Sequence, residues 1–452
     1  MKFNPRIFKA YDIRGLYPDE INESIVNQIG RGLIATLKAR RIGVSRDMRT
    51  SSPALASAFI EGALEQGADV VDYGMLGTDM LYFAVARDGL DAGAQITASH
   101  NPKQYNGIKM VREDALPLSG ETGIGEIRDL LATKEIPRTK RNRGTLTFQK
   151  VTPDYIKKVM SFINPASISP FRIVLDAGSG MAGLVAGQIF DHLPCTTTKL
   201  CFDIDGTFPN HEANPLLVIN RKDITDRVIS DQADIGIAWD GDADRCFFID
   251  EDGEFVPGDF ITALLAESFL LKEPGSTIVY DLRASHAVRD TVAQNGGTAL
   301  MNRVGHAFIK RRMREENCIF GGEVTGHYYF RDFYYADNGF IPALLILDLM
   351  SKQKKSLKNL LKPYRENYFI SGEINTKLQS MDEIEKKLSV LRKKYSNGKI
   401  LDLDGISVDY PDWHFNVRPS NTEPLLRLNL EAGTPVLMEK KRDEVLRLIR
   451  TT

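Results

Sequence analysis

The 452-residue sequence is poor in cysteine and contains no long hydrophobic run. Its cysteines are Cys195, Cys201, Cys246 and Cys318, and no Cys-x-x-Cys pair occurs. So few thiols in a long chain are typical of a reducing compartment, where buried structural thiols are the expected role. No stretch approaches the roughly 20 apolar residues of a membrane span, and residues 1–15 lack the apolar segment of a secretory signal. These absences predict a cytoplasmic protein with no membrane partner.

Net charge is also nearly absent. Lys and Arg total 58 against 60 for Asp and Glu, which gives a formal net charge of −2. A dedicated nucleic-acid binder usually carries a strong basic excess, so we expect no nucleic-acid partner. The basic run at residues 352–362 is interpreted as a solvated helix face and linker. Because the field of the whole molecule is weak, an anionic ligand has to be met by local clusters of Lys and Arg.

The sequence does contain a repeated alternation of strand-like and helix-like segments. Apolar strands at residues 42–45, 69–73 and 94–97 alternate with helical stripes, which is typical of parallel βαβ units. The pattern recurs and then gives way to a Lys-rich helix, short strands and a final helix. We therefore predict three successive α/β domains and a smaller C-terminal α+β domain. Their expected bounds are residues 1–149, 150–252, 253–366 and 367–452.

Ser99 lies in the loop Thr97-Ala-Ser-His-Asn-Pro102, directly after a predicted strand. A serine there would project at the carboxyl end of the strand, where α/β sheets place their ligands. It is therefore a candidate nucleophile or phosphate carrier, with His100 adjacent and Lys109 further along. A polar turn ended by Asn-Pro is the alternative. The chain has no Gly-x-Ser-x-Gly elbow, which argues against a hydrolase.

Asp240, Asp242 and Asp244 occupy alternate positions after another apolar strand. Close carboxylates repel one another, so their burial would require a cation, and hard oxygen ligands suit Mg²⁺, Mn²⁺ or Ca²⁺. An EF-hand is disfavoured because Arg245 stands where that loop requires glycine. Three carboxylates would leave room for a phosphate oxygen on the metal, and a solvated acidic turn is the alternative.

Two later loops carry groups that suit sugars and phosphates. In Gly321-Gly-Glu-Val-Thr-Gly-His327, glycines permit a close backbone approach, and Glu323 and Thr325 can bind adjacent sugar hydroxyls. In Arg418-Pro-Ser-Asn-Thr-Glu-Pro424, a guanidinium, two hydroxyls, an amide and backbone N–H groups form a candidate anion nest, with Arg427 beyond. A tight turn and a surface turn are the respective alternatives. Together the four loops predict a phosphosugar enzyme whose site lies where four domains meet.

These loops, in this order, make the chain closely resemble the α-D-phosphohexomutases, and bacterial phosphomannomutases in particular. The segments Phe8-Lys-Ala-Tyr-Asp-Ile-Arg-Gly15 and Asn106-Gly-Ile-Lys109 add to the resemblance, which covers nearly the whole chain. It implies three related α/β domains and a C-terminal α+β domain around one central cleft. It also implies an intramolecular phosphotransferase of the isomerase class that interconverts mannose 1-phosphate and mannose 6-phosphate. A phosphoserine enzyme and a hexose 1,6-bisphosphate, as intermediate and activator, would carry the phosphate.

The resemblance also implies a role for each matching residue. Ser99 would be the phosphorylated serine, and as phosphoserine it would hold Mg²⁺ together with Asp240, Asp242 and Asp244. The other expected catalytic residues are His100, Lys109, Arg14, Arg245 and His306. The expected substrate-binding residues are Tyr11, Arg283, Glu323, Thr325, His327, Arg418, Ser420, Asn421, Thr422 and Arg427. Hexose phosphates are the only partners implied, and no obligate protein partner is.

Several alternatives stay open at this point. The enzyme could accept both mannose and glucose phosphates, because sugar preference depends on how residues 323–327 meet the ring hydroxyls. A phosphoglucosamine mutase is less favoured, since relatives with that activity tend to carry Ser-Ala-Ser-His-Asn-Pro. A phosphosugar-binding protein without catalysis and a metal-dependent phosphatase are the alternatives from other classes. The sequence assigns neither the general acid and base nor the oligomeric state.

Overall fold

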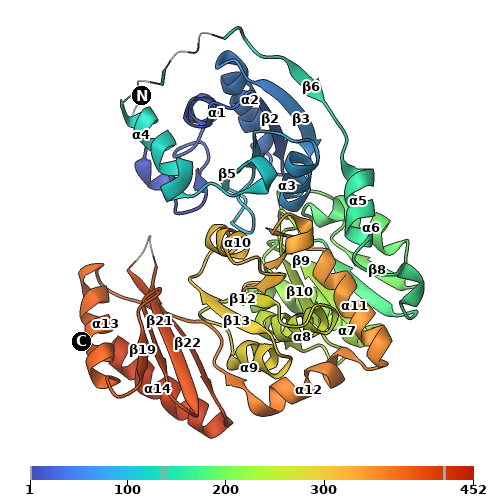
Figure 1. Cartoon of the computed structure of the whole chain (residues 1–452), viewed down its shortest axis with the longest axis vertical. Coiled ribbons are helices and arrows are strands. Elements are labelled where there is room, and N and C mark those ends of the chain that lie inside the picture. The colour runs from blue at the N-terminus through green and yellow to red at the C-terminus, as the bar shows by residue number, and fades with distance from the viewer. Residues whose placement is uncertain (1–2, 134–135, 138, 140, 421–423, 452) are drawn as a thin grey trace.

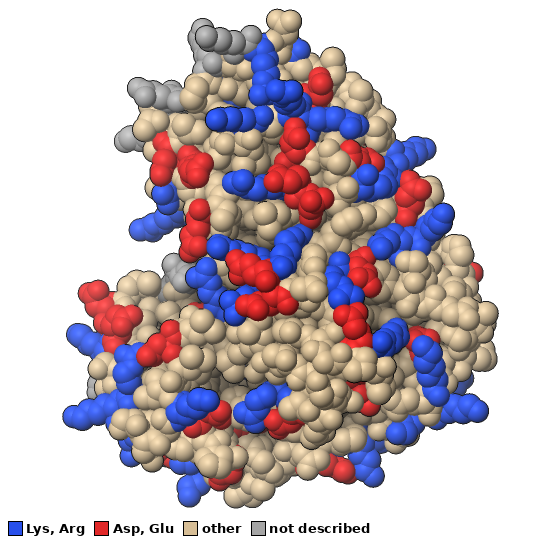
Figure 2. Space-filling model, viewed as in Figure 1, with Lys and Arg blue, Asp and Glu red and all other residues tan. Residues whose placement is uncertain are grey.

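The computed structural model describes residues 3–133, 136–137, 139, 141–420 and 424–451. These residues form successive units, each built on its own β-sheet (Figure 1). The first unit lies at one end of the molecule, the second and third pack together, and the fourth stands beside the third. Figure 2 shows a recess between the first and fourth units, with charged side chains of both signs along its visible edge. The predicted multi-domain α/β architecture is confirmed.

The first unit contains a six-stranded sheet in the order β1-β5-β4-β2-β3-β6. Its parallel strands β4, β2, β3 and β6 are extended at one edge by β5, which runs antiparallel to β4, and by β1, which runs antiparallel to β5. Helix α1 buries an apolar stripe that includes Ile25, Ile29 and Leu33. The elements are β1 (Ile13–Leu16), α1 (Glu23–Leu37), β2 (Arg41–Arg46), α2 (Ser52–Glu65), β3 (Asp69–Met75), α3 (Thr78–Arg87), β4 (Ala92–Ile96), β5 (Tyr105–Arg112), α4 (Gly125–Thr133) and β6 (Leu146–Phe148).

The second unit has a five-stranded sheet in the order β11-β10-β9-β7-β8. Strands β8, β7 and β9 are parallel, and β10 and β11 continue the sheet antiparallel. Every residue of β9 is buried, as its continuous apolar sequence predicts for a central parallel strand. The elements are α5 (Thr152–Met160), β7 (Arg172–Asp176), α6 (Ala182–Phe190), β8 (Thr196–Leu200), α7 (Lys222–Ser230), β9 (Ile235–Trp239), β10 (Cys246–Ile249) and β11 (Phe255–Val256).

The third unit has a sheet in the order β13-β12-β14-β15-β16. Strands β13, β12 and β14 are parallel, whereas β15 pairs antiparallel with both β14 and β16. Lysines of the basic run at residues 352–362 are exposed at the end of α11 and along α12, where a solvated helix face was expected. The elements are α8 (Gly258–Lys272), β12 (Thr277–Asp281), α9 (His286–Gln294), β13 (Thr298–Asn302), α10 (His306–Glu315), β14 (Phe320–Gly322), β15 (Tyr328–Phe330), β16 (Ala336–Asp337), α11 (Ile341–Gln353) and α12 (Leu357–Asn367).

The fourth unit is the predicted α+β unit. Its sheet runs β17-β22-β21-β20-β19, with β18 also paired to β22, and its neighbouring strands are antiparallel. The helices α13 and α14 lie beside this sheet (Figure 1). The elements are β17 (Phe369–Ile370), β18 (Ile374–Lys377), α13 (Asp382–Lys394), β19 (Lys399–Leu401), β20 (Ile406–Asp409), β21 (Trp413–Pro419), β22 (Leu425–Ala432) and α14 (Pro435–Arg450).

One continuous apolar core joins the first three units. It includes Phe83 of α3, Tyr155 of α5, Trp239 of β9 and Phe340, and the Trp239 indole donates a hydrogen bond to the carbonyl of Gly339 at 2.7 Å. The fourth unit has a separate core of its own. The shared core fixes the loops that follow β4, β9 and β14 relative to one another. No helix in the described part of the chain is long and apolar enough to cross a membrane.

Candidate active site

Ser99 is fully buried in the loop after β4 and touches the aspartate loop of the second unit. Its hydroxyl donates a hydrogen bond to Oδ2 of Asp240 at 2.7 Å, and its backbone has a left-handed φ of 50°. The carbonyl of Ser99 accepts a hydrogen bond from the buried guanidinium of Arg49 at 2.8 Å. Gly241 lies so close that a Cβ there would stand 2.4 Å from the Ser99 carbonyl oxygen. The two loops therefore meet only because position 241 has no side chain.

Arg49 is a residue that sequence analysis missed. Its guanidinium also donates to the carbonyls of Asn101 and Pro102, and it pairs with Asp47 at 3.2 Å. Both members of this pair are wholly inaccessible to solvent. The available signal was a cluster of charged residues directly after an apolar strand, which is where α/β sheets place their sites. The pair holds the serine loop from the side of the first unit.

Asp240, Asp242 and Asp244 follow β9, and all of them are buried. One oxygen from each lies within 4.8 Å of the others. Burial and the neighbouring carboxylates Asp242 and Asp244 raise the pKa of Asp240 well above its usual range. A solvated acidic turn, the alternative considered for this loop, is inconsistent with this burial.

Two cationic side chains partly offset these three carboxylates. The Lys109 ammonium contacts Oδ2 of Asp242 at 2.7 Å and Oδ2 of Asp244 at 2.5 Å, while Arg245 Nε lies 3.4 Å from Asp240. Burial alone would lower the pKa of Lys109, but the surrounding aspartates outweigh it and raise that pKa. Two positive charges leave one negative charge uncompensated. The buried Oδ1 atoms of Asp242 and Asp244 also make no hydrogen bond with a described residue. These residues fit a hard divalent cation such as Mg²⁺.

The predicted sugar loop begins where β14 ends. Glu323 is buried there, and its carboxylate accepts hydrogen bonds from the Gly305 N–H at 3.2 Å and from the Tyr329 hydroxyl. Arg283, which follows β12, approaches the same carboxylate at 3.6 Å. Thr325 is half-buried in this loop. Glu323 is thus held in place by the third unit's own groups.

His327 links this loop to the aspartates. Its Nδ1 lies 2.9 Å from Oδ2 of Asp337 and 3.8 Å from Oδ1 of Asp244. Asp337 in turn forms an ion pair with Lys310 at 2.6 Å, and both are fully buried. The buried pair of Lys310 and Asp337 is a second feature that sequence analysis missed, because neither residue belongs to a recognisable motif. It orients His327 toward the aspartate loop.

The first and third units meet at Tyr11 and His306. Their rings lie 4.8 Å apart in an edge-on arrangement, and His306 opens helix α10. Burial and the nearby Lys310 lower the pKa of His306 well below its usual value, so its ring is neutral near pH 7. Arg14 lies close by on β1, where it donates to Asn101 at 2.6 Å and pairs with Asp12. The pKa of His100 is likewise lowered by burial and by Arg245.

The predicted phosphate clamp lies at the boundary of the third and fourth units. Arg418 on β21 and Arg427 on β22 face each other in register, and each contacts the carboxylate of Glu373, at 3.4 and 3.5 Å. Arg283 of the third unit reaches the same carboxylate at 3.5 Å. Arg283 is also paired with Asp281 at 2.9 Å. Arg418 and Arg427 against the single carboxylate of Glu373 therefore leave an excess of one positive charge. The Nε atoms of Arg418 and Arg427 are buried and make no hydrogen bond with a described residue.

Ser420, the next predicted clamp residue, is buried, and its N–H donates to the Leu425 carbonyl at 2.8 Å. Asn421 and Thr422 lie outside the described residues. Glu373 was missed from sequence because a single glutamate before a short strand carries no signal. Through Arg283 it connects the clamp to Glu323, and so to the loop that contains His327. Contacts between described residues thus connect Ser99 and the aspartates, through His327, Glu323 and Arg283, to Arg418 and Arg427, whereas Thr325 lies in the same loop as Glu323 and His327.

Comparisons with known proteins match all four units of the fold. Successive parts of the chain match the phosphoglucomutase/phosphomannomutase domains I (residues 5–138), II (153–253) and III (257–368) and the C-terminal domain (373–448). A phosphomannomutase from Escherichia coli is 43% identical, covering 98% of this chain and 99% of that protein. A Xanthomonas campestris protein named for phosphohexose mutases is 41% identical, covering 98% and 99%. A solved phosphoglucomutase/phosphomannomutase family structure from Burkholderia thailandensis aligns with a TM-score of 0.90 and 30% identity, covering 99% and 98%.

Four domain models matched in order, together with relatives at 41–43% identity over nearly the whole chain, define the class of this protein as a phosphosugar mutase. The chain belongs to the phosphoglucomutase/phosphomannomutase family, the α-D-phosphohexomutases. It is an enzyme that moves a phosphate group within a sugar, and hence an isomerase.

Proposed function

We propose that this enzyme is a phosphomannomutase that interconverts mannose 1-phosphate and mannose 6-phosphate. The observation that carries the proposal is the contact between the Ser99 hydroxyl and Asp240 at the edge of a buried carboxylate triad. The phosphomannomutase names of relatives at about 42% identity support the choice of sugar.

In the proposed reaction, phosphorylated Ser99 transfers its phosphoryl group to the free hydroxyl of a hexose phosphate. The bond from phosphorus to Ser99 Oγ breaks, a bond to the sugar oxygen forms, and the hydroxyl proton passes to a protein base. The resulting hexose 1,6-bisphosphate reorients in the site, so that its other phosphate faces Ser99, and it transfers that phosphate back to the serine. Such a transfer depends mainly on alignment and charge neutralisation. Mg²⁺ held by Asp240, Asp242, Asp244 and the phosphoserine would supply part of that neutralisation.

In this proposal, protein side chains supply the rest of the charge neutralisation and the proton transfer. Lys109 stays protonated because carboxylates surround it, so it can neutralise or protonate a phosphate oxygen. Arg245 lies 3.4 Å from Asp240 and would face the same phosphate. His100, with Nδ1 3.2 Å from Ser99 Oγ, and His306 are neutral and are candidates for carrying the proton, together with Arg14.

Recognition of the sugar phosphate would be divided between two loops. Arg418, Ser420, Arg427 and Arg283 would hold the phosphate that is not being transferred, and the family pattern adds Asn421 and Thr422. Glu323, Thr325 and His327 would contact ring hydroxyls, with Tyr11 at the opposite side. A second candidate is a dual-specificity enzyme that also uses glucose phosphates, which is favoured by the broader name of the Xanthomonas relative.

A single assay separates the proposed function from its rivals. The enzyme is given mannose 1-phosphate or glucose 1-phosphate with a trace of the bisphosphate, and sugar 6-phosphate and inorganic phosphate are measured in parallel. A phosphomannomutase forms mannose 6-phosphate with no net release of phosphate. Comparable kcat/KM for both sugars would establish dual specificity. Release of inorganic phosphate would indicate a phosphatase, and binding without turnover would contradict the proposed activity.

A further inference from the structure

Three potential metal ligands converge in the second unit, away from the serine and the aspartate triad. Asp176 is the last residue of β7, Cys201 directly follows β8, and His211 lies in the loop before α7. The two strands are parallel neighbours, with Asp176 opposite Leu200, so both side chains emerge at the same carboxyl edge of the sheet. Ligand atoms of the three residues lie within 4.8 Å of one another.

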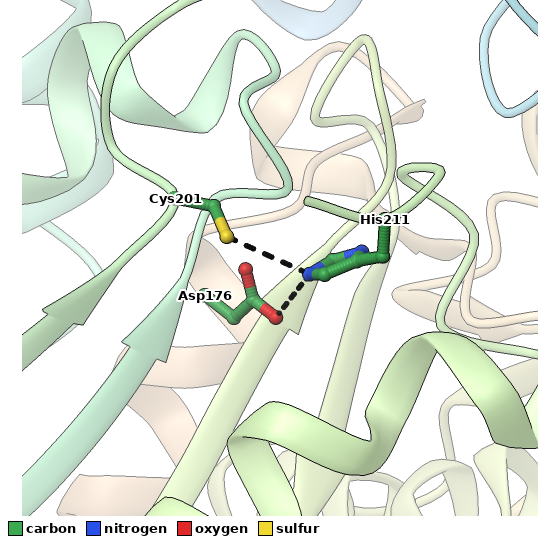
Figure 3. A group of neighbouring side chains, drawn as sticks. All are labelled: Asp176, Cys201 and His211. Carbon is green, nitrogen blue, oxygen red and sulfur yellow. Dashed lines mark hydrogen bonds and ion pairs between the residues drawn. The ribbon is translucent and has the colours of Figure 1, made fainter. Parts of the chain in front are cut away.

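The sulfur and the carboxylate approach the same ring nitrogen. His211 Nε2 lies 3.0 Å from Asp176 Oδ2 and 3.7 Å from Cys201 Sγ, and Figure 3 shows both groups directed at one edge of the imidazole. That nitrogen has one position in the ring plane, occupied either by a hydrogen or by a lone pair. It therefore cannot serve both neighbours in good geometry. One cation placed between the three atoms would give each of them a partner.

The remaining polar atoms of these side chains are already held. Asp176 Oδ1 accepts a hydrogen bond from the Gly178 N–H at 2.9 Å, and His211 Nδ1 lies 3.0 Å from the Glu212 carbonyl oxygen. A metal-bound histidine usually donates its other N–H to a carbonyl or carboxylate, which fixes the ring. The arrangement leaves Asp176 Oδ2, Cys201 Sγ and His211 Nε2 as the atoms aimed at a common point.

We propose that Asp176, Cys201 and His211 bind a zinc ion. Tetrahedral coordination with Zn–S of about 2.3 Å and Zn–N of about 2.0 Å places sulfur and nitrogen roughly 3.5 Å apart, close to the separation found here. A thiolate, an imidazole and a carboxylate together favour Zn²⁺ over Mg²⁺, which prefers oxygen ligands alone. Asp176 and His211 are largely buried, whereas Cys201 is half-buried, so a water can complete the coordination.

The site would order a loop that packs against Met48 and Arg49, which in turn support the serine loop. Between Cys201 and His211 the chain carries Phe208, whose ring lies 5.4 Å from the guanidinium carbon of Arg49. Arg49 donates to the Ser99 carbonyl. Gly206 is part of the same contact, because a Cβ there would stand 2.4 Å from the Met48 carbonyl oxygen. Zinc bound at this edge would therefore stabilise the support of Ser99 without touching the substrate.

The test uses the full-length enzyme, stripped with a chelator and then kept in excess Mg²⁺ so that the aspartate triad is saturated. Titration with Co²⁺, a spectroscopic substitute for zinc, should give a thiolate-to-cobalt charge-transfer band in the near ultraviolet. It should saturate at one equivalent per chain, and Zn²⁺ should abolish it. If the wild type gives no such band and retains no zinc on dialysis, the three residues form only an ion pair and a hydrogen bond, and the proposal is wrong.

Variants identify the ligands. Cys201→Ser should lose the band and weaken zinc binding by at least about 100-fold. Loss of a residue that only hydrogen-bonds a metal ligand already costs about 10- to 100-fold in affinity, and Cys201 would bind the metal directly. Cys195→Ser is the matched control, because Cys195 is a half-buried thiol of the same unit that contacts the Ser169 carbonyl instead. It should keep both the band and the affinity. A band that persists in Cys201→Ser, or disappears in Cys195→Ser, would overturn the assignment.

Discussion

The hydroxyl of Ser99 donates a hydrogen bond of 2.7 Å to Asp240, a residue 141 positions further along the chain. The contact joins the carboxyl end of β4 in the first unit to that of β9 in the second. It brings the proposed phosphate carrier next to the proposed metal ligands. The chemistry of the site thus depends on how the first and second units pack together.

Ser99→Ala should abolish turnover, because it removes the oxygen that carries the phosphate. We expect kcat to fall by more than about 10³-fold, and the free energy of unfolding to fall by only about 1–3 kcal/mol because the buried hydrogen bond to Asp240 is lost. Mass spectrometry should find a phosphate on the wild type that is missing from the variant. Ser57→Ala, which changes an exposed serine on α2, is the control and should behave as the wild type. Undiminished turnover in Ser99→Ala would exclude the covalent mechanism.

The aspartate triad should make both activity and stability depend on Mg²⁺. Three buried carboxylates face only two cations, so a bound divalent ion relieves repulsion in the folded state. At a free Mg²⁺ concentration of about 100 times Kd, we expect about 2.7 kcal/mol of added stability. Asp242→Asn should lose most of the activity and most of this stabilisation, whereas Asp226→Asn, on exposed α7, should keep both. Full activity of the chelated wild type without added metal would show that the triad is not a metal site.

Much of this site could be predicted from the sequence because its loops follow strands with a clear apolar signal. Asp240 comes directly after β9, and Ser99 closely follows β4, so the carboxyl-edge rule placed both correctly at sheet edges. Arg49 and Glu373 could not be found in this way. Each is an ordinary charged residue whose role comes from partners distant in sequence, such as the Ser99 carbonyl 50 positions away. A contact between two charged residues from different units produces no repeating pattern in the sequence, so nothing near either residue predicts it.

Asp259 should make stability fall as the pH rises. This buried carboxyl accepts a hydrogen bond from the Ser285 N–H at 3.0 Å, and burial is the main cause that raises the pKa of Asp259 to about 6. An unfolded aspartate titrates near 3.9, so the protonated form stabilises the fold below about pH 4 and this contribution is lost as the pH passes about 6. Asp259→Asn should therefore match the wild type at pH 4 and be more stable at pH 8, by up to about 3 kcal/mol.

Denaturant unfolding at the two pH values checks this expectation. The exposed control Asp226→Asn should show no such pH-dependent difference, because its carboxylate stays in solvent. An Asp259→Asn variant that loses stability equally at both pH values would mean that the ionised form of Asp259 is needed in the fold.

Arg418→Ala should weaken the use of every accepted hexose phosphate to a similar extent. The guanidinium lies beside Arg427 and a single carboxylate, Glu373, which leaves an excess of one positive charge, and it would recognise phosphate rather than the sugar ring. A charge-assisted contact contributes roughly 1.5–3 kcal/mol, so kcat/KM should fall about 10- to 150-fold. Arg442→Ala, which changes a half-buried arginine on α14 paired with Asp443, is the matched control and should leave kcat/KM unchanged. A loss confined to one sugar would be incompatible with a phosphate clamp.

Glu323→Gln should instead change the ratio of mannose 1-phosphate to glucose 1-phosphate use. Its carboxylate is held by the Gly305 N–H, the Tyr329 hydroxyl and Arg283, so it presents a fixed acceptor to the ring hydroxyls. The amide keeps the shape but replaces one acceptor oxygen with a donor, which alters the match to a hydroxyl whose configuration differs between the two sugars. The measurement is kcat/KM for both substrates in wild type, Glu323→Gln and Arg418→Ala. A strong change in sugar preference from Arg418→Ala, with none from Glu323→Gln, would show that the roles of these two loops are reversed.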